Sequence, residues 1–421
     1  MNGKTLSRIL LGLLGAALLA SAAFAASDKV LIAGGEAFGS GGDEVVGTFL
    51  DALSPDLGDD LLLVVPSARR SDGDIVTLAA LMTAHGADPA IVDTENLRAS
   101  DLNGKAAVWI AGGEERLLAA LFDTLSGDLA DLGRSVLLAA TGEAASFLGG
   151  LRVEPVAGNA PLLHPEKLVF SAGADLLPSD YLRGALVVPE ARAKGYGGLL
   201  MAASAAANRM ALGPDGEGAL FIEGESIRAL GNGGTYIVDA RAAEPLAAGP
   251  LDRSDMVLSY MSFGDGLDGR TGRFTAPEDK DDVIAVSYYW VSEQRPGNAL
   301  FDGDELYRTV TEDLVDNDAD GAYGFSLSEI TEAGAEGVFA FFSEEENTEG
   351  YWIRDRARGF DIYSFFNVAA DVAPVTLTFK DVDLGLAADG GSSSSGGCSL
   401  GTPLSAALLL LPLALTALRR R

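Results

Sequence analysis

Short apolar runs alternate with amphipathic stretches along the first 150 residues. The apolar runs cover residues 29–35, 61–66, 106–113 and 135–141, and helical spacing follows each at residues 43–53, 75–85, 115–125 and 144–148. Buried parallel strands have continuous apolar sequences, whereas the helices that cover them are amphipathic. The pattern therefore predicts an α/β fold with a doubly wound, mostly parallel sheet. Ligands of such sheets bind at the carboxyl ends of the strands, where the glycine-rich turns fall.

The alternation weakens after residue 150 and stops near residue 276. Further strands are expected at residues 186–188, 219–222 and 235–239, with a helix that begins near Gly198 and ends at residues 208–212. Beyond residue 276, acidic and aromatic residues increase, and the sequence predicts strands at 284–291, 338–342, 359–366 and 375–379 and a helix at 304–314. We therefore predict an α/β domain over residues 28–275 and a small, mostly β accessory module over residues 276–385.

Both ends of the chain carry sorting features. Lys4 and Arg8 precede an apolar stretch, and Ala23-Phe24-Ala25 forms a small-x-small site, which predicts a secretory signal peptide over residues 1–25. The alternative is an uncleaved N-terminal anchor. A Gly/Ser spacer over residues 386–399 precedes an apolar and basic segment over residues 400–421, which is just long enough to span a bilayer. We expect an exported protein held in the cell envelope by its C-terminal segment.

Cys398 is the single cysteine, so an internal disulfide is excluded. It lies just before the C-terminal apolar run, within reach of an enzyme that processes or lipidates proteins. The Gly-Gly-Cys, the apolar stretch and the terminal arginines together resemble the Synerg-CTERM type of sorting domain. That resemblance implies a processing enzyme as a partner. The alternative is a plain tail anchor that is never processed.

The chain is strongly acidic, with 61 Asp and Glu against 30 Lys and Arg and a formal net charge of −31. Such a surface repels phosphate backbones, so we expect no nucleic-acid partner.

Four glycine-rich or acidic turns give the first domain a family resemblance. They are Ile32-Ala-Gly-Gly-Glu36, Trp109-Ile-Ala-Gly-Gly-Glu-Glu-Arg-Leu117, Ala140-Thr-Gly-Glu-Ala-Ala145 and Gly264-Asp-Gly-Leu-Asp268. In order and spacing they are similar to the cyanophycinase and dipeptidase E family of serine peptidases. Residues 251–258, before the last of these turns, resemble the closing strand of that family. The resemblance covers about residues 28–275 and implies a fold of the class I glutamine-amidotransferase-like kind.

The family's catalytic residues are not conserved at the matching positions. The nucleophilic serine corresponds to Gly142, its following alanine to Glu143, and the general-base histidine to Glu190. The third member of the triad matches the neighbourhood of Asp215 and Glu217. A serine peptidase needs a hydroxyl and a base within hydrogen-bond reach. We therefore assign no catalytic residue and predict an inactive homologue of these peptidases.

Carboxylates take the place of the lost catalytic groups. Glu36, Glu114, Glu115, Glu143 and Glu190 all belong to turns at one edge of the predicted sheet, and such a cleft favours a guanidinium, an ammonium or a metal ion. The predicted ligand-binding residues are Gly112, Gly113, Glu114, Glu115, Arg116, Glu143 and Glu190. We expect a cationic or peptide ligand. The alternatives are a peptidase or hydrolase with a rebuilt carboxylate site, and a structural or adhesive surface protein.

No cofactor is required by this interpretation, but one segment has calcium-loop spacing. Asp316, Asp318 and Asp320 alternate before Gly321, as in a calcium-binding loop. The closing bidentate carboxylate is expected at position 327, which is a leucine. Calcium binding by these three residues is therefore an expectation, with an acidic turn as the alternative.

Overall fold

The computed structural model describes residues 29–35, 41–53, 61–102, 105–122, 136–242, 249–286, 299–328, 334–355 and 360–378. The predicted signal peptide, the spacer with Cys398 and the C-terminal segment lie outside these ranges. Within the described ranges, no helix combines the length and the apolar character needed to cross a membrane. The described residues within 29–328 and 337–375 belong to one compact unit, which contains every element discussed below as part of the site.

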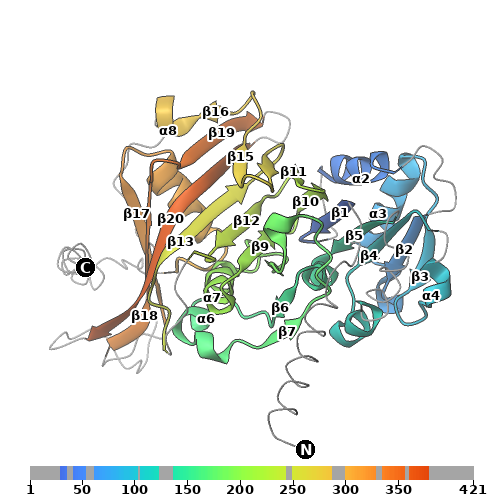
Figure 1. The fold of residues 1–421 in the computed structure, drawn as a ribbon, viewed down its shortest axis with the longest axis horizontal. Helices are drawn as coiled ribbons and strands as arrows, with labels where there is room; N and C mark the ends of the chain where they lie inside the picture. The colour runs from blue at the N-terminus through green and yellow to red at the C-terminus, as the bar shows by residue number, and fades with distance from the viewer. Residues whose placement is uncertain are drawn as a thin grey trace, which may run out of the picture. The chain divides into compact units, whose positions relative to one another are not determined.

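The first sheet has a parallel half that agrees with the predicted fold class. β1 (Lys29–Ala33), β5 (Leu137–Thr141), β4 (Ala107–Ala111), β2 (Leu61–Val65) and β3 (Ala90–Asp93) lie in this order and are all parallel (Figure 1). Strands β1, β2, β4 and β5 are confirmed from the apolar runs. β3 was not predicted, because its residues are partly exposed at the edge of the sheet.

Helices cover both faces of this parallel half. α2 (Gly42–Asp51) and α3 (Gly73–Ala84) bury Phe49 and Leu78 against one face, in a core that includes Trp109. On the other face, α4 (Ala99–Leu102) and the helical residues 115–122 contribute Leu102, Leu118 and Phe122 to a second core. The predicted helix at residues 144–148 is a 3₁₀ helix, η4 (Gly142–Leu148). This covering on two faces is the doubly wound arrangement expected from the sequence.

The same sheet continues with antiparallel strands beyond β1. β10 (Gly218–Glu223), β11 (Ser226–Gly231), β14 (Gly266–Asp268) and β15 (Arg273–Thr275) follow in this order. Only β10 among them was expected as a strand from its apolar sequence.

A second sheet contains the later part of the chain. Its order is β16 (Asp281–Asp282), β19 (Glu349–Asp355), β20 (Phe360–Thr378), β13 (Arg253–Met261), β12 (Thr235–Asp239), β9 (Met210–Pro214), β8 (Leu186–Val187), β6 (Leu151–Val153) and β7 (Phe170–Ala172). β17 (Gly321–Leu327) pairs with β18 (Gly334–Ser343), which pairs with β20. Strands on both sides of residue 275 therefore share one sheet. The domain boundary predicted at residue 275 stays a prediction.

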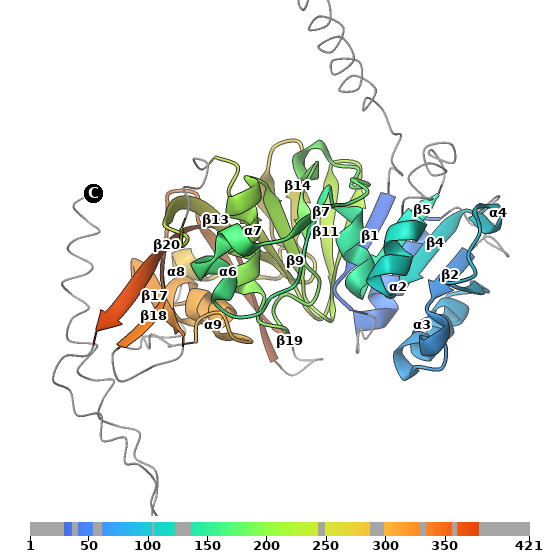
Figure 2. The ribbon, with the colours of Figure 1, turned by 90° about the horizontal axis from the view of Figure 1, so that it is seen from below.

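One local prediction in this region was correct in part, and another was wrong. The helix expected to end at residues 208–212 is α7 (Gly197–Ala207), which ends at the left-handed Asn208, and β9 begins two residues later. A left-handed residue terminates a helix and redirects the chain. The strand expected at 284–291 begins instead as α8 (Val283–Val286), and its remainder lies outside the described residues. Figure 2 shows α7 against the sheet, where it contacts β9 and β12.

Several further short helices lie along the described part of the chain. They are η3 (Ser67–Arg69), α6 (Ala160–Leu163), η5 (Pro165–Lys167), η6 (Asp180–Leu182), α9 (Glu305–Val310) and the π-helical η7 (Thr311–Val315). The helix predicted at residues 304–314 is thus confirmed as α9 and η7. The strands predicted at 359–366 and 375–379 belong to the single long strand β20.

Candidate functional site

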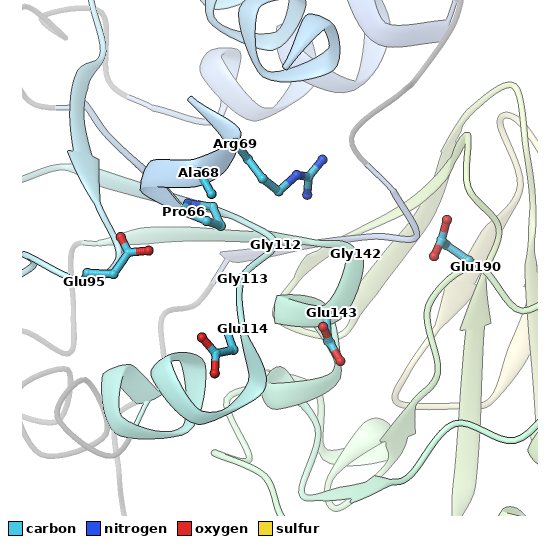
Figure 3. Close-up of a pocket in the computed structure, with 10 residues that line it drawn as sticks. All are labelled: Pro66, Ala68, Arg69, Glu95, Gly112, Gly113, Glu114, Gly142, Glu143 and Glu190. Carbon is cyan, nitrogen blue, oxygen red and sulfur yellow. The ribbon is translucent and has the colours of Figure 1, made fainter. Parts of the chain in front are cut away.

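A pocket of about 470 Å³ lies beyond the carboxyl ends of the parallel strands. Ten residues line it: Pro66, Ala68, Arg69, Glu95, Gly112, Gly113, Glu114, Gly142, Glu143 and Glu190 (Figure 3). They follow β2, β3, β4, β5 and β8 in the chain. The pocket is therefore at the edge where ligands of doubly wound sheets bind.

Gly142 forms the bend between β5 and η4. Its φ of +56° lies in the left-handed region, where a side chain other than hydrogen strains the backbone. Thr141 before it is fully buried, and Glu143 after it faces the pocket. A strand-to-helix bend with a left-handed residue at its apex is therefore present, and that residue has no side chain.

Among the described residues that line the pocket, none carries a hydroxyl, thiol or imidazole group. The nearby Ser146 is buried, donates its hydroxyl to the Glu143 carbonyl at 2.8 Å and accepts a hydrogen bond from Arg152 at 3.1 Å. His85 contacts Asp43, and His164 contacts Glu166, both away from the pocket lining. The described lining thus supplies no nucleophile–base pair.

Burial and neighbouring charges shift the pKa of the Glu143 carboxyl group. Partial removal from water raises the pKa of its carboxyl group, and the negative charge of Glu115 raises it further. Arg152 and Lys194 act in the opposite direction, and Glu190 adds to the increase. A positive ligand that entered the pocket would relieve this repulsion and favour the ionised carboxylate.

Two other lining carboxylates, those of Glu95 and Glu190, contact donors of the protein itself. Glu95 accepts hydrogen bonds from the Ser67 backbone N–H at 3.1 and 3.3 Å, and backbone hydrogen bonds at Glu95 and Ser67 lower its pKa. Glu190 lies 3.1 Å from Lys194 Nζ and has a left-handed φ of +56°. A non-glycine residue in that conformation persists only where its surroundings fix it.

Asp215 and Arg192 fix the loop that carries Glu190. Asp215 Oδ1 accepts the Ala193 N–H at 3.1 Å, and burial raises the pKa of this carboxyl group. Arg192 donates to Asp304 at 2.6 Å and to the Tyr260 hydroxyl at 3.3 Å. Its guanidinium also lies 3.9 Å from the centre of the Tyr307 ring, a cation–π contact. The Glu190 backbone is therefore anchored from two sides.

The structure brings together five of the seven predicted ligand-binding residues. Gly112, Gly113, Glu114, Glu143 and Glu190 line the pocket, whereas Glu115 and Arg116 do not. Glu115 instead lies 3.1 Å from Arg152, and Arg116 is exposed on the helix. Glu36 lies outside the described residues.

Sequence reasoning missed four lining residues, Pro66, Ala68, Arg69 and Glu95. The Pro-Ser-Ala-Arg turn directly follows the apolar run that became β2, and that position was a usable signal. Glu95 follows β3, an edge strand with no apolar run to indicate it.

The predicted calcium segment shows a different set of contacts. Asp316 is fully buried and its Oδ2 accepts the Tyr363 hydroxyl at 2.7 Å, while Asn317 donates to the Glu312 carbonyl. No group of three or more His, Cys, Asp or Glu side chains in the described part of the chain is arranged to hold a metal ion. Calcium binding at Asp316, Asp318 and Asp320 stays a prediction.

The chain is similar to solved structures at low sequence identity. No family model and no curated protein matches the chain. Among solved structures, a peptidase from an acI-B1 actinobacterium is 14% identical with a TM-score of 0.37, covering 57% of this chain and 96% of its own. A putative peptidase E protein from Listeria monocytogenes EGD-e is 10% identical with a TM-score of 0.32, covering 48% and 96%.

Proposed function

We propose that this chain is an exported, surface-retained relative of the cyanophycinase and dipeptidase E peptidases that binds a cationic or peptide ligand without serine chemistry. One observation carries the proposal: four glutamates and one arginine line a single pocket. Arg69, the only basic side chain among the described lining residues, donates to Asp72 at 2.8 Å. The pocket thus has an excess of negative charge that a cation can neutralise.

The sequence resemblance and the geometry support the loss of peptidase activity together. The bend that resembles the family's nucleophile turn is occupied by Gly142, and the position of its histidine by Glu190. Export and retention at the cell envelope rest on the sorting features at the two ends of the sequence.

Isothermal titration calorimetry on the full chain in detergent tests this proposal. Arginine amide and an arginine-containing dipeptide are the cationic probes, and the citrulline analogues are their neutral counterparts. The proposal predicts binding of the cationic probes and none of the neutral ones. Equal heats for both, or no heat for either, would exclude it.

A rebuilt hydrolase is a second candidate, because one observation favours it. The raised pKa of Glu143 is a property of general acids and bases, and Glu190 lies in the same pocket. Release of amino acids from Asp- or Arg-containing dipeptides, abolished by both Glu143→Gln and Glu190→Gln, would establish this function.

The adhesive alternative gains no support from the described aromatic residues. Trp352 and Tyr351 on β19 are partly buried and pack against the two large hydrophobic cores. Tyr288, Tyr289 and Trp290 lie outside the described residues.

A further inference from the structure

A lysine and an aspartate meet in the interior, away from the pocket. Lys280 Nζ lies 2.6 Å from Asp265 Oδ1, and their side chains are 1% and 0% exposed. Asp265 precedes β14, and Lys280 follows β15, so the two residues lie at the base of the β14–β15 hairpin. Buried charged residues are rare, and Asp265 and Lys280 are two of the few in the part of the chain that the structure describes.

Two serines complete the surroundings of this pair. Lys280 Nζ also donates to Ser262 Oγ at 2.8 Å and to Ser364 Oγ at 2.9 Å. Asp265 Oδ2 accepts the Ser262 backbone N–H at 2.7 Å and the Ser364 hydroxyl. Both oxygens of the carboxyl group are thus engaged, Oδ1 by the amine and Oδ2 by these two donors and, at 3.5 Å, by the Ser262 hydroxyl.

Burial disfavours the charged form of both partners. Removal from water raises the pKa of Asp265 and lowers the pKa of Lys280, although each charge partly offsets the shift of the other. The 2.6 Å hydrogen bond provides a direct path for the proton from the ammonium to the carboxylate. The resulting neutral amine is a nucleophile held against a carboxylic acid.

We propose that Lys280 and Asp265 join through an intramolecular isopeptide bond. Lys280 transfers a proton to Asp265 Oδ1, and its free Nζ attacks the Asp265 side-chain carbonyl carbon Cγ. The negative charge that develops on Oδ2 is stabilised by the Ser262 N–H and the Ser364 hydroxyl, as in an oxyanion hole. The C–Oδ1 bond then breaks, Nζ loses a second proton, and Oδ1 leaves as water. The products are one amide and one water molecule, with no oxidant or other co-reactant.

The proposed bond would crosslink the two ends of a hairpin. It would close the β14–β15 hairpin at the edge of the first sheet, next to Ser364 on β20 of the second sheet. The sequence has one cysteine and so cannot form an internal disulfide. An isopeptide bond would give an exported protein a comparable crosslink that reducing agents do not break.

Peptide mapping of the full chain tests the proposal without any mutation. Trypsin cleaves after Arg253, Arg270 and Arg273, and it cleaves after Lys280 only if the amine is free. The bond predicts that the peptide of residues 254–270 is joined to one that begins at Phe274 and reads through residue 280. The joined species is one water molecule lighter than the sum of its parts, and tandem mass spectrometry should locate the link at Asp265 and Lys280.

Two variants serve as controls. Lys280→Arg keeps a cation beside Asp265 but cannot form the amide, so its digest should contain only separate peptides that end at residues 270 and 280. Asp265→Ala should release the same two peptides. Separate peptides from the unmodified chain after prolonged incubation of the folded protein would overturn the proposal, and this result does not depend on whether either variant folds. The mapping is independent of cation binding in the pocket.

Discussion

Lys194 Nζ lies 3.1 Å from Glu190 Oε2, and this ion pair is part of the acidic pocket's own charge balance. The pKa of Lys194 is raised by its hydrogen bond to Glu190, while the charge of Lys194 also lowers the pKa of Glu143. A protein side chain therefore already supplies part of the positive charge that balances the carboxylates of this pocket.

Removal of this internal cation should strengthen ligand binding. Lys194→Ala leaves Glu190 without its partner, so a cationic ligand no longer competes with Lys194. Exposed ion pairs are worth about 0.2–1 kcal/mol, which corresponds to an affinity gain of roughly 1.4- to 5-fold. Titration of arginine amide into the variant and the unmodified chain measures the change. Weaker binding by Lys194→Ala would show that Lys194 contacts the ligand instead.

Cation binding should weaken as the pH falls. Because the pKa of Glu143 is raised, its carboxylate takes up a proton at a higher pH than an ordinary glutamate does. The contribution of Glu143 to binding is fully present above this pKa. It decreases as the pH falls through the pKa, since the neutral carboxyl group attracts the cation less. Calorimetric titrations between neutral and acidic pH measure the profile. Glu143→Gln should remove this step and leave only the decrease due to the remaining glutamates.

Introduction of a serine at the bend should not restore a peptidase. Gly142→Ser places a side chain at a φ of +56°, which costs about 1–2 kcal/mol of stability. The position that matches the family's histidine is Glu190, so no histidine base is expected for the new hydroxyl and no dipeptide hydrolysis is expected. Thermal unfolding and a dipeptide assay measure the two effects. Hydrolysis by the single variant would refute the argument that the base is missing as well as the nucleophile.

The Asp265 and Lys280 pair should be a major contribution to stability. Removal of one partner leaves the other buried without compensation, a loss of about 3–5 kcal/mol for a buried pair. Lys280→Met and Asp265→Leu should each lower the denaturant midpoint, and the double variant should lose less than the sum of the two. Additive losses in this double-mutant cycle would mean that the two side chains do not interact.

The parallel half of the fold could be predicted because its strands are buried on both faces. Leu61 to Val65 and Ala107 to Ala111 are fully buried, and their continuous apolar sequences indicate this directly. β3 and β14 are short and lie at or near the edge of a sheet, so their sequences carry little of that signal. The pairing of β20 with β13 joins residues more than 100 positions apart, and no local pattern indicates it.

The site was predictable where a residue directly follows a recognisable strand. Gly142, Glu143 and Glu114 are such residues, and the glycine-rich turns identified them. Arg192 was not found, because its role depends on Tyr260, Tyr307 and Asp304 from distant segments. Glu115 was expected in the pocket but is on the first turn of a helix and contacts Arg152. The direction of a side chain on the first turn of a helix depends on its position around the helix axis. The sequence did not define that position for Glu115.

Titration of arginine amide into Glu143→Gln and into the unmodified chain measures whether the carboxylates of this pocket bind a cation. The variant removes one negative charge at the pocket wall with little change of shape. Loss of one charge-assisted hydrogen bond costs about 1.5–3 kcal/mol, so arginine amide should bind roughly 10- to 150-fold more weakly at neutral pH. Glu336→Gln, an exposed glutamate outside the pocket lining, should bind like the unmodified chain. Equal affinity for Glu143→Gln and the unmodified chain would contradict the account.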